Sequence, residues 1–167
     1  MDRKEIESID LSDFRHSLPV QIRFNDIDIL GHLNNIVYFA LYDLAKARFL
    51  ETIRDGHVDW RKVECVIANI DCTYIKQILF GEEIEVKSRC IHLGERSFIL
   101  RQCLVEVKTQ EIRSVCDTVM VCFDPSTGKS APMSPTLRSA IINYEKMTDI
   151  LPYPESDSAG GDIKAEK

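Results

Sequence analysis

The sequence predicts an α+β fold in which a curved antiparallel sheet wraps around one long central helix and a short C-terminal helix follows the sheet. Three features indicate this fold. One long helical pattern, residues 35–54, is apolar around most of its circumference in its first half, which is typical of a buried helix. Four long strand-like runs with short connections follow it, as in an antiparallel sheet. Near the C-terminus, Ser134-Pro135 opens a short amphipathic pattern.

The chain is expected to form one domain at residues 18–152, preceded by a lead-in at 1–17 and followed by a tail at 153–167. A length of 167 residues is most simply a single domain. The lead-in is polar and weakly patterned, so we expect it to be extended or partly ordered. The tail is small, polar and charged, and we expect it to be disordered.

Composition limits the classes of partner. The net charge of −6 at pH 7 gives no general attraction to nucleic acid or to anionic membranes. Residues 1–5 lack the apolar core of a signal peptide. No apolar run approaches the roughly 20 residues that a membrane span requires. We therefore expect a cytoplasmic protein with neither a nucleic-acid partner nor a membrane partner.

Six cysteines raise the alternatives of disulfides or a metal site. None of them forms a C-x-x-C pair, and nearly all lie in strand-like runs. Without an export signal, such cysteines are expected to be reduced and to pack as small apolar side chains. The four histidines are scattered and form no H-x-x-x-H pair. The sequence therefore predicts neither a metal site nor a cofactor.

The elements follow in order along the chain. Pro19 opens the first predicted strand, whose apolar run covers residues 20–24, because a missing N–H is tolerated where a strand begins. Asn34 or Asn35 is the expected N-cap of the long helix, and Gly56 lies where a left-handed residue would end it. Alternating apolar and polar residues then predict the remaining strands, at about residues 64–74, 84–90, 97–108 and 112–123. A turn at 124–129 and a helix from 135 to about 147 complete the pattern.

A dense polar stretch separates the first strand from the long helix. It contains two carboxylates, a glycine, a histidine and two asparagines within ten residues, and such polar groups would be costly to bury for packing alone. From Asp26 to Tyr38 the stretch reads D-x-D-x-x-G-H-x-N-N-x-x-Y. This string resembles the hotdog-fold acyl-CoA thioesterases of the 4-hydroxybenzoyl-CoA thioesterase type.

The resemblance implies a single hotdog domain that hydrolyses an acyl-CoA thioester to free acid and CoA, with Asp28 as the base or nucleophile. Thioester hydrolysis needs such a carboxylate and a donor for the developing oxyanion. The N-terminal amides of a helix can be that donor. His32 and Asn35 are the other catalytic candidates. The expected substrate-binding residues are Gly31, Asn34, Tyr38, Ser97 and Arg96.

Two residues of the polar stretch, Asp26 and Tyr38, also have a structural interpretation. Asp26 is expected to be a turn residue that accepts backbone N–H bonds, and Tyr38 belongs either to the core or to the pocket wall.

Ser97 matches, by resemblance, a small polar position that would contact the pantetheine arm. Cations on the strands are candidates for the CoA phosphates, although such charges usually form a solvated face. These cations are Lys76, Lys87, Arg89 and Arg96.

Alternative functions remain open at this point. They are an acyl carrier protein thioesterase, a non-catalytic acyl-CoA-binding module on the same fold, and a dehydratase. The dehydratases of this superfamily tend to use a different signature, so Asp28 ahead of the helix argues against them. A sheet wrapped around a helix leaves an unpaired strand edge, which oligomerisation can cover. We expect a homodimer or homotetramer, with a site where two subunits meet.

Overall fold

The computed structural model describes residue 1 and residues 3–147. Its elements, in chain order, are α1 (Arg3–Glu7), a 3-10 turn (Leu11–Asp13), β1 (His16–Val20), a second 3-10 turn (Phe24–Asp26), α2 (Asn35–Thr52), β2 (Cys65–Tyr74), β3 (Ile84–Leu93), β4 (Ser97–Glu106), β5 (Ile112–Asp124), β6 (Lys129–Ser130) and α3 (Pro135–Glu145). The expected disordered tail lies outside the described residues.

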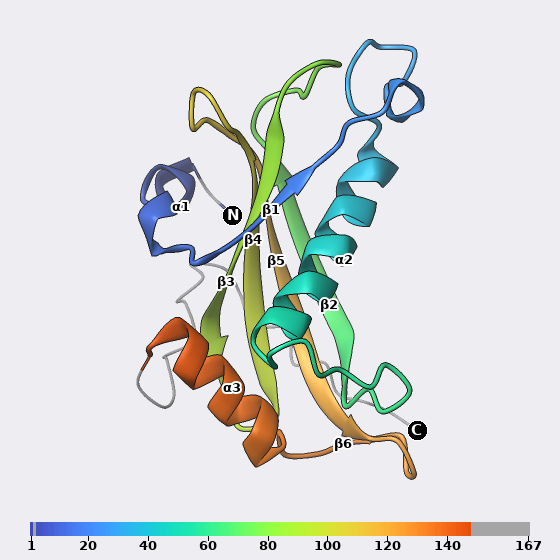
Figure 1. The fold of residues 1–167 in the computed structure, drawn as a ribbon, viewed down its shortest axis with the longest axis vertical. Coiled ribbons are helices and arrows are strands. Elements are labelled where there is room, and N and C mark those ends of the chain that lie inside the picture. The colour runs from blue at the N-terminus through green and yellow to red at the C-terminus, as the bar shows by residue number, and fades with distance from the viewer. Residues whose placement is uncertain (2, 148–167) are drawn as a thin grey trace.

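The strands form one antiparallel sheet in the order β1-β3-β4-β5-β2, with the short β6 paired to β5. The long helix α2 lies across one face of this sheet, and α3 lies beside its C-terminal end (Figure 1). The α+β prediction, with one long helix against an antiparallel sheet and a short C-terminal helix, is confirmed.

The first strand differs from the prediction. The strand covers His16–Val20 instead of residues 20–24, and Phe24–Asp26 forms a 3-10 turn. Because β1 is an edge strand that pairs with β3 alone, Pro19 fits inside it without breaking the ladder. The carboxylate of Asp26 accepts the backbone N–H of Arg23 at 2.8 Å, which closes the turn where the strand was expected to continue.

The lead-in is more ordered than expected. It contains α1 and the first 3-10 turn, and it delivers Phe14 to a small apolar cluster with Cys103, Val105 and Val115. Phe14 is 7% exposed. The packing of Phe14 could not be predicted from the polar composition of residues 1–17, because a single aromatic side chain produces no periodic pattern. The segment therefore packs on the sheet instead of only preceding it.

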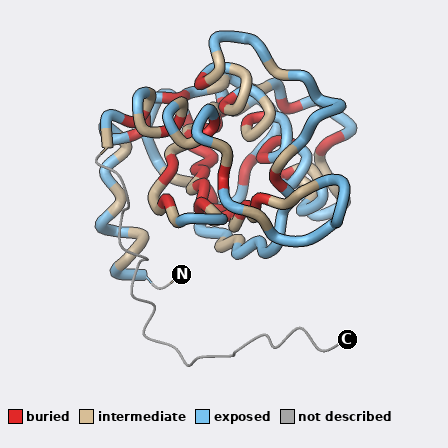
Figure 2. Tube along the Cα trace, turned by 90° about the horizontal axis from the view of Figure 1, so that it is seen from below, coloured by how far each residue is buried: buried red, intermediate tan, exposed pale blue. Residues whose placement is uncertain are grey.

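Two apolar clusters follow α2 along its length, and buried segments gather in the middle of the molecule (Figure 2). The first half of the helix packs Tyr38, Leu41 and Tyr42 against residues of β3, β4 and β5, whereas Phe49 belongs to the second cluster with α3. The sequence predicted a buried helix, and the structure buries one face of α2 and leaves the other exposed. Ile36 is 72% exposed, because only one face of the helix meets the sheet.

The helix boundaries follow from caps that the sequence predicts. Asn34 is the N-cap of α2, since its side-chain oxygen accepts the backbone N–H of Ile36 at 3.0 Å. Gly56, with φ of +81°, donates its N–H to Glu51 at 2.8 Å after the helix ends. Ser134 caps α3 by accepting the N–H of Leu137 at 3.2 Å, one residue before Pro135. The alternative between Asn34 and Asn35 is thereby resolved in favour of Asn34.

Candidate active site

A tight hairpin carries Asp28 to the N-terminal end of α2. Ile27 and Leu33 form an antiparallel bridge, and Asp28 and His32 lie just inside it, where the Asp28 N–H donates to the His32 carbonyl at 3.0 Å. Gly31 donates its own N–H to the Asp28 carbonyl at 3.0 Å and has a φ of +81°. A residue with a side chain would be strained at this φ, so glycine permits the turn to close.

The two aspartates of the polar stretch have different environments. Asp26 has a side chain that is only 4% exposed and that pairs with the Arg23 guanidinium at 2.7 Å. The hydrogen bond from Arg23 holds the pKa of Asp26 below its ordinary value. Its carbonyl also accepts the N–H of Asn34 at 2.9 Å, which joins the 3-10 turn to the helix cap. Asp26 is therefore a structural residue, as the sequence suggested.

Asp28 lies at the solvent boundary, where its side chain is 23% exposed. One carboxylate oxygen, Oδ1, accepts the Leu30 N–H at 2.8 Å, and this bond fixes the orientation of the group. The other oxygen, Oδ2, lies 3.9 Å from Nδ1 of His32. A carboxylate held at one oxygen and facing an imidazole at the other is suited to attack an acyl carbon or to accept a proton from water.

A cavity of about 440 Å³ opens beside this carboxylate. It brings together four of the predicted site residues, namely Asp28, His32, Asn35 and Tyr38. As the first residue of α2, Asn35 has no intrahelical acceptor for its backbone N–H, and the partial positive charge of the helix terminus lies at the same place. The remaining lining residues are Leu30, Leu33, Tyr74, Ile75, Lys76 and Gln77.

The wall opposite the hairpin was not predicted as part of the site, apart from Lys76 as a possible phosphate contact. It begins with Tyr74 at the end of β2, whose ring meets Tyr38 edge to face with centroids 5.0 Å apart. Burial raises the pKa of Tyr38, which a backbone hydrogen bond of Ile78 partly opposes. The only sequence signal for this wall was its position directly after a strand. Loops that follow rigid strands often carry functional residues.

Arg113 on β5 holds this wall in place. Its carbonyl accepts the N–H groups of both Ile75 and Lys76, at 2.9 and 3.0 Å. Its guanidinium, on a side chain that is 5% exposed, pairs with Glu82 at 2.6 Å and with Glu111 at 3.1 Å. One buried arginine therefore fixes both ends of the segment from 75 to 82, which faces the hairpin across the cavity.

Ser97 and Arg96 lie away from this cavity. Ser97 is opposite Val121 on β5, and Val121 is opposite Val66 near the start of β2. Tyr74 is eight residues further along β2, a separation of roughly 26 Å at the usual rise per residue. Within one chain, the structure therefore does not bring Ser97 or Arg96 to Asp28. Gly31 and Asn34 shape the hairpin and the cap, but neither is among the residues that line the cavity.

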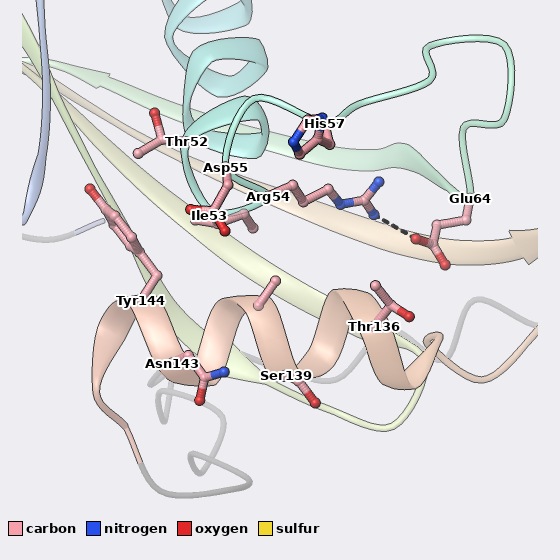
Figure 3. Close-up of a pocket in the computed structure, with 11 residues that line it drawn as sticks. Thr52, Ile53, Arg54, Asp55, His57, Glu64, Thr136, Ser139, Asn143 and Tyr144 are labelled. Atoms are coloured by element: carbon pink, nitrogen blue, oxygen red, sulfur yellow. Dashed lines mark hydrogen bonds and ion pairs between the residues drawn. The ribbon is translucent and has the colours of Figure 1, made fainter.

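A second, larger cleft of about 650 Å³ lies between the C-terminal end of α2 and α3. Figure 3 shows Arg54 paired with Glu64 on one side of it, and Ser139 and Asn143 of α3 on the other. None of the residues in the polar stretch lines this cleft. The chemistry expected from the sequence therefore belongs to the smaller cavity.

Comparison with known proteins identifies the family. A family model described as the thioesterase-like superfamily matches residues 22–141. The chain belongs to that superfamily. A thioesterase from Thermus thermophilus, crystallised with coenzyme A and Zn, is 28% identical with a TM-score of 0.72, over 81% of this chain and 98% of that one. This thioesterase superfamily member therefore has the hotdog fold that the polar stretch predicted, whereas the 4-hydroxybenzoyl-CoA subtype stays a resemblance.

A more distant solved structure agrees on the fold, and one curated protein matches part of the sequence. The 1,4-dihydroxy-2-naphthoyl-CoA thioesterase Slr0204 from Synechocystis is 13% identical with a TM-score of 0.68, over 76% of this chain and 95% of that one. The uncharacterized protein YsmA of Bacillus subtilis (strain 168) is 24% identical over 81 residues, which are 48% of this chain and 54% of YsmA. The chain thus spans about half the length of that curated relative.

Neither a metal cluster nor a membrane-spanning helix is found among the described residues. Within that part of the chain, no group of three or more His, Cys, Asp or Glu side chains is arranged to hold a metal ion. The described helices include none that is both long enough and apolar enough to cross a bilayer.

Proposed function

We propose that this protein is an acyl-CoA thioesterase, in which Asp28 is the catalytic carboxylate. The observation that carries the proposal is the position of Asp28 and His32 at a cavity beside the first turn of α2. Membership of the thioesterase-like superfamily and the coenzyme A bound to the Thermus thermophilus relative support it. Of the alternatives, an acyl carrier protein thioester would present the same bond to Asp28.

In the proposed reaction the thioester carbonyl lies between Asp28 and the start of α2. Either Oδ2 of Asp28 attacks the carbonyl carbon and water then hydrolyses the resulting anhydride, or Asp28 accepts a proton from the water that attacks. The backbone N–H of Asn35 stabilises the oxyanion that develops on the carbonyl oxygen. The C–S bond breaks, and the CoA thiolate leaves and takes up a proton. The Leu30 N–H holds Oδ1 of Asp28, and His32 lies beside the reacting oxygen, with Nδ1 3.9 Å from Oδ2.

A panel of acyl-CoA esters, assayed for thiol release, tests this function. Asp28→Asn should lower kcat/KM by about 10²-fold or more while the protein stays folded, because an amide neither attacks nor accepts the proton. Asp43→Asn is the matched control, since Asp43 lies on the exposed side of α2 with a side chain that is 64% exposed. Acyl-CoA binding without thiol release in the native protein would contradict an enzyme and support the binding module. Loss of an enoyl-CoA signal without thiol release would favour a dehydratase.

The same assay distinguishes the two possible donors of the acyl group, coenzyme A and acyl carrier protein. Coenzyme A brings phosphate groups that need a cation, and Lys76 is the lysine that lines the cavity. Its side chain is 53% exposed, and its ammonium pairs with Glu111 at 2.7 Å. Lys76→Met should therefore raise KM for acyl-CoA and leave KM for an acyl-pantetheine, which lacks the 3′-phosphate and the diphosphate, unchanged. Faster turnover of acyl carrier protein thioesters than of any acyl-CoA would make that carrier the substrate.

We also propose that the site is completed by a second copy of the chain. β2 pairs only with β5, and its free edge carries apolar side chains that are 39–49% exposed. These side chains are Val66, Ile67, Ile70 and Tyr74. Antiparallel pairing of two β2 strands about Ile70 would place Tyr74 of one copy beside Val66 of the other. Ser97 and Arg96 of that second copy would then lie near the cavity.

Mixed dimers provide the test of this arrangement. Arg96→Glu and Asp28→Asn should each lower activity alone, whereas a mixture exchanged through partial unfolding should regain activity. Each mixed dimer would retain one site in which Asp28 and Arg96 are both native. Full activity of Arg96→Glu alone, or a monomer by sedimentation at assay concentration, would contradict the proposal. A tetramer built from such dimers would show the same complementation.

A further inference from the structure

Two cysteines face each other across the ladder between the edge strand β2 and its neighbour β5. Cys65 is opposite Cys122 in the register, and their Sγ atoms are 2.8 Å apart. The two residues are 57 positions apart in the sequence. Both side chains are buried, with Cys65 8% and Cys122 1% exposed. From the sequence, these cysteines were expected only to pack as small apolar side chains, because spacing along the chain does not reveal cross-strand pairs.

The position of the pair in the ladder suits a covalent link. The adjacent pair is hydrogen-bonded, since Phe123 donates its N–H to the Glu64 carbonyl at 2.9 Å. Hydrogen-bonded and non-hydrogen-bonded pairs alternate in an antiparallel ladder, so Cys65 and Cys122 form a non-hydrogen-bonded pair. The Cα atoms of such pairs are about 4.5 Å apart, within the range that a disulfide spans. The backbone therefore needs little movement for the two sulfurs to bond.

The other cysteines show that this arrangement is particular to the edge strand. Cys72 on β2 is likewise opposite Cys116 on β5. In contrast, Cys103 on β4 is opposite Lys87 and Val115. The ladder therefore places cysteines opposite each other between β2 and β5, and it places no cysteine opposite Cys103.

We propose that Cys65 and Cys122 form a redox modification site, at which a low-molecular-weight disulfide closes a covalent clasp between β2 and β5. One cysteine thiolate attacks the oxidant, forms a mixed disulfide and releases one small thiol. The other cysteine then attacks the mixed disulfide, forms the Cys65–Cys122 bond and releases the second small thiol. Two protein thiols are oxidised and one small disulfide is reduced to two thiols. This proposal does not depend on the proposed thioesterase activity.

The environment of the pair predicts slow reaction followed by a stable product. The hydrogen bond between the two side chains raises the pKa of Cys65 and lowers the pKa of Cys122, and both side chains are buried away from an oxidant in the closed strand. Oxidation then requires the start of β2 to open. Once formed, the bond closes a loop of 57 residues and reduces the conformational freedom of the unfolded chain. Within one copy, the clasp lies at the end of β2 away from Tyr74.

Incubation of the full-length reduced protein with oxidised glutathione tests the clasp. After alkylation in denaturant and digestion, the expected product is an intramolecular peptide pair that joins Cys65 to Cys122 and disappears after treatment with dithiothreitol. The midpoint of thermal unfolding should rise by on the order of 5 °C in the oxidised protein. Cys122→Ser should abolish both effects, and Cys72→Ser, the matched control, should retain them.

Two results would overturn the proposal. One is alkylation of Cys65 and Cys122 as complete as that of Cys103 after prolonged oxidation. The other is a glutathione adduct at either cysteine that never resolves to the internal bond. If Cys122→Ser fails to fold, Cys65→Ala at the more exposed member of the pair is used instead, and the same peptide map decides the outcome.

Discussion

The rings of Tyr38 and Tyr74 meet edge to face, with their centroids 5.0 Å apart. This contact joins the first turn of α2 to the end of β2 at the wall of the cavity. It connects the helix that carries the proposed oxyanion donor to the strand edge that is proposed to pair with a second copy.

Two replacements of Tyr74 should distinguish the contribution of its ring to kcat/KM from that of its hydroxyl. Tyr74→Phe retains the aromatic contact with Tyr38 and should leave kcat/KM within about 2-fold. Tyr74→Ala loses the contact, worth about 1 kcal/mol, and should lower kcat/KM by roughly 5- to 10-fold. Steady-state kinetics on the same acyl-CoA measures both. Equal losses in the two variants would assign the effect to the hydroxyl and contradict a packing role.

Replacement of Arg113 should loosen the wall that faces the hairpin. Arg113→Met retains the length of the side chain but leaves Glu82 without its buried partner, at a cost of about 2 kcal/mol in the free energy of unfolding. The cost stays below that of a fully buried pair, because the Glu82 side chain is 23% exposed. Urea denaturation measures the loss. Lys76→Met, the matched control at a half-exposed pair with the same Glu111, should cost less than about 1 kcal/mol.

Asp26→Asn should weaken the fold at neutral pH without removing the chemistry. The hydrogen bond from Arg23 lowers the pKa of Asp26, so the charged carboxylate stabilises the folded state above its ordinary pKa of 3.8. That contribution is lost as the pH falls through the lowered pKa of the folded state. The variant should therefore be less stable by about 1 to 2 kcal/mol at pH 7 and indistinguishable from the native protein at the acid end.

The kinetics of the same variant distinguish the two aspartates. The folded fraction of Asp26→Asn should retain most of the native kcat, in contrast to Asp28→Asn. A loss of kcat as large as that of Asp28→Asn, measured at a temperature where both variants are folded, would place Asp26 in the catalytic machinery instead of the turn.

Glu145→Gln should stabilise the protein at neutral pH. Burial raises the pKa of Glu145, and the N–H of Cys90, which donates to it at 2.8 Å, opposes this effect only in part. A carboxyl with a raised pKa contributes stability below its unfolded pKa and loses it as the pH rises through its folded pKa. Glutamine keeps an acceptor for Cys90 without the charge. The melting temperature of the variant should exceed that of the native protein at pH 7.5, and the difference should disappear near pH 4.

Local sequence signals were sufficient for most of the fold. The caps at Asn34 and Ser134 are chemical features of single residues, and the long alternating strands have a period that no helix shares. The strand at His16–Val20 was displaced in the prediction, because Pro19 was taken to mark a beginning although an edge strand tolerates it internally. The order of Phe14 depends on a distant surface, which a local pattern does not contain.

The candidate site was predictable only where it is continuous in sequence. Asp28, His32, Asn35 and Tyr38 lie within one turn and the start of one helix, and the structure places them at one cavity. Tyr74 reaches the same cavity from the end of another element, so only the pairing of strands reveals it. The register also separates Ser97 from these residues, because it lies at the opposite end of the ladder.

The packing of Phe14 restricts how copies of this chain can associate. Phe14 covers the outer face of the sheet near Cys103 and Val115, on the side opposite α2. Stacking of two sheets back to back would have to displace Phe14, so the strand edges of β1 and β2 and the exposed side of α2 are the surfaces that can contact a second copy. Pairing of two β2 strands about a twofold axis covers the β2 edge of each copy. The outer edges of such a closed dimer are the two β1 strands, which are only five residues long and contain Pro19, so they are poor templates for adding further strands.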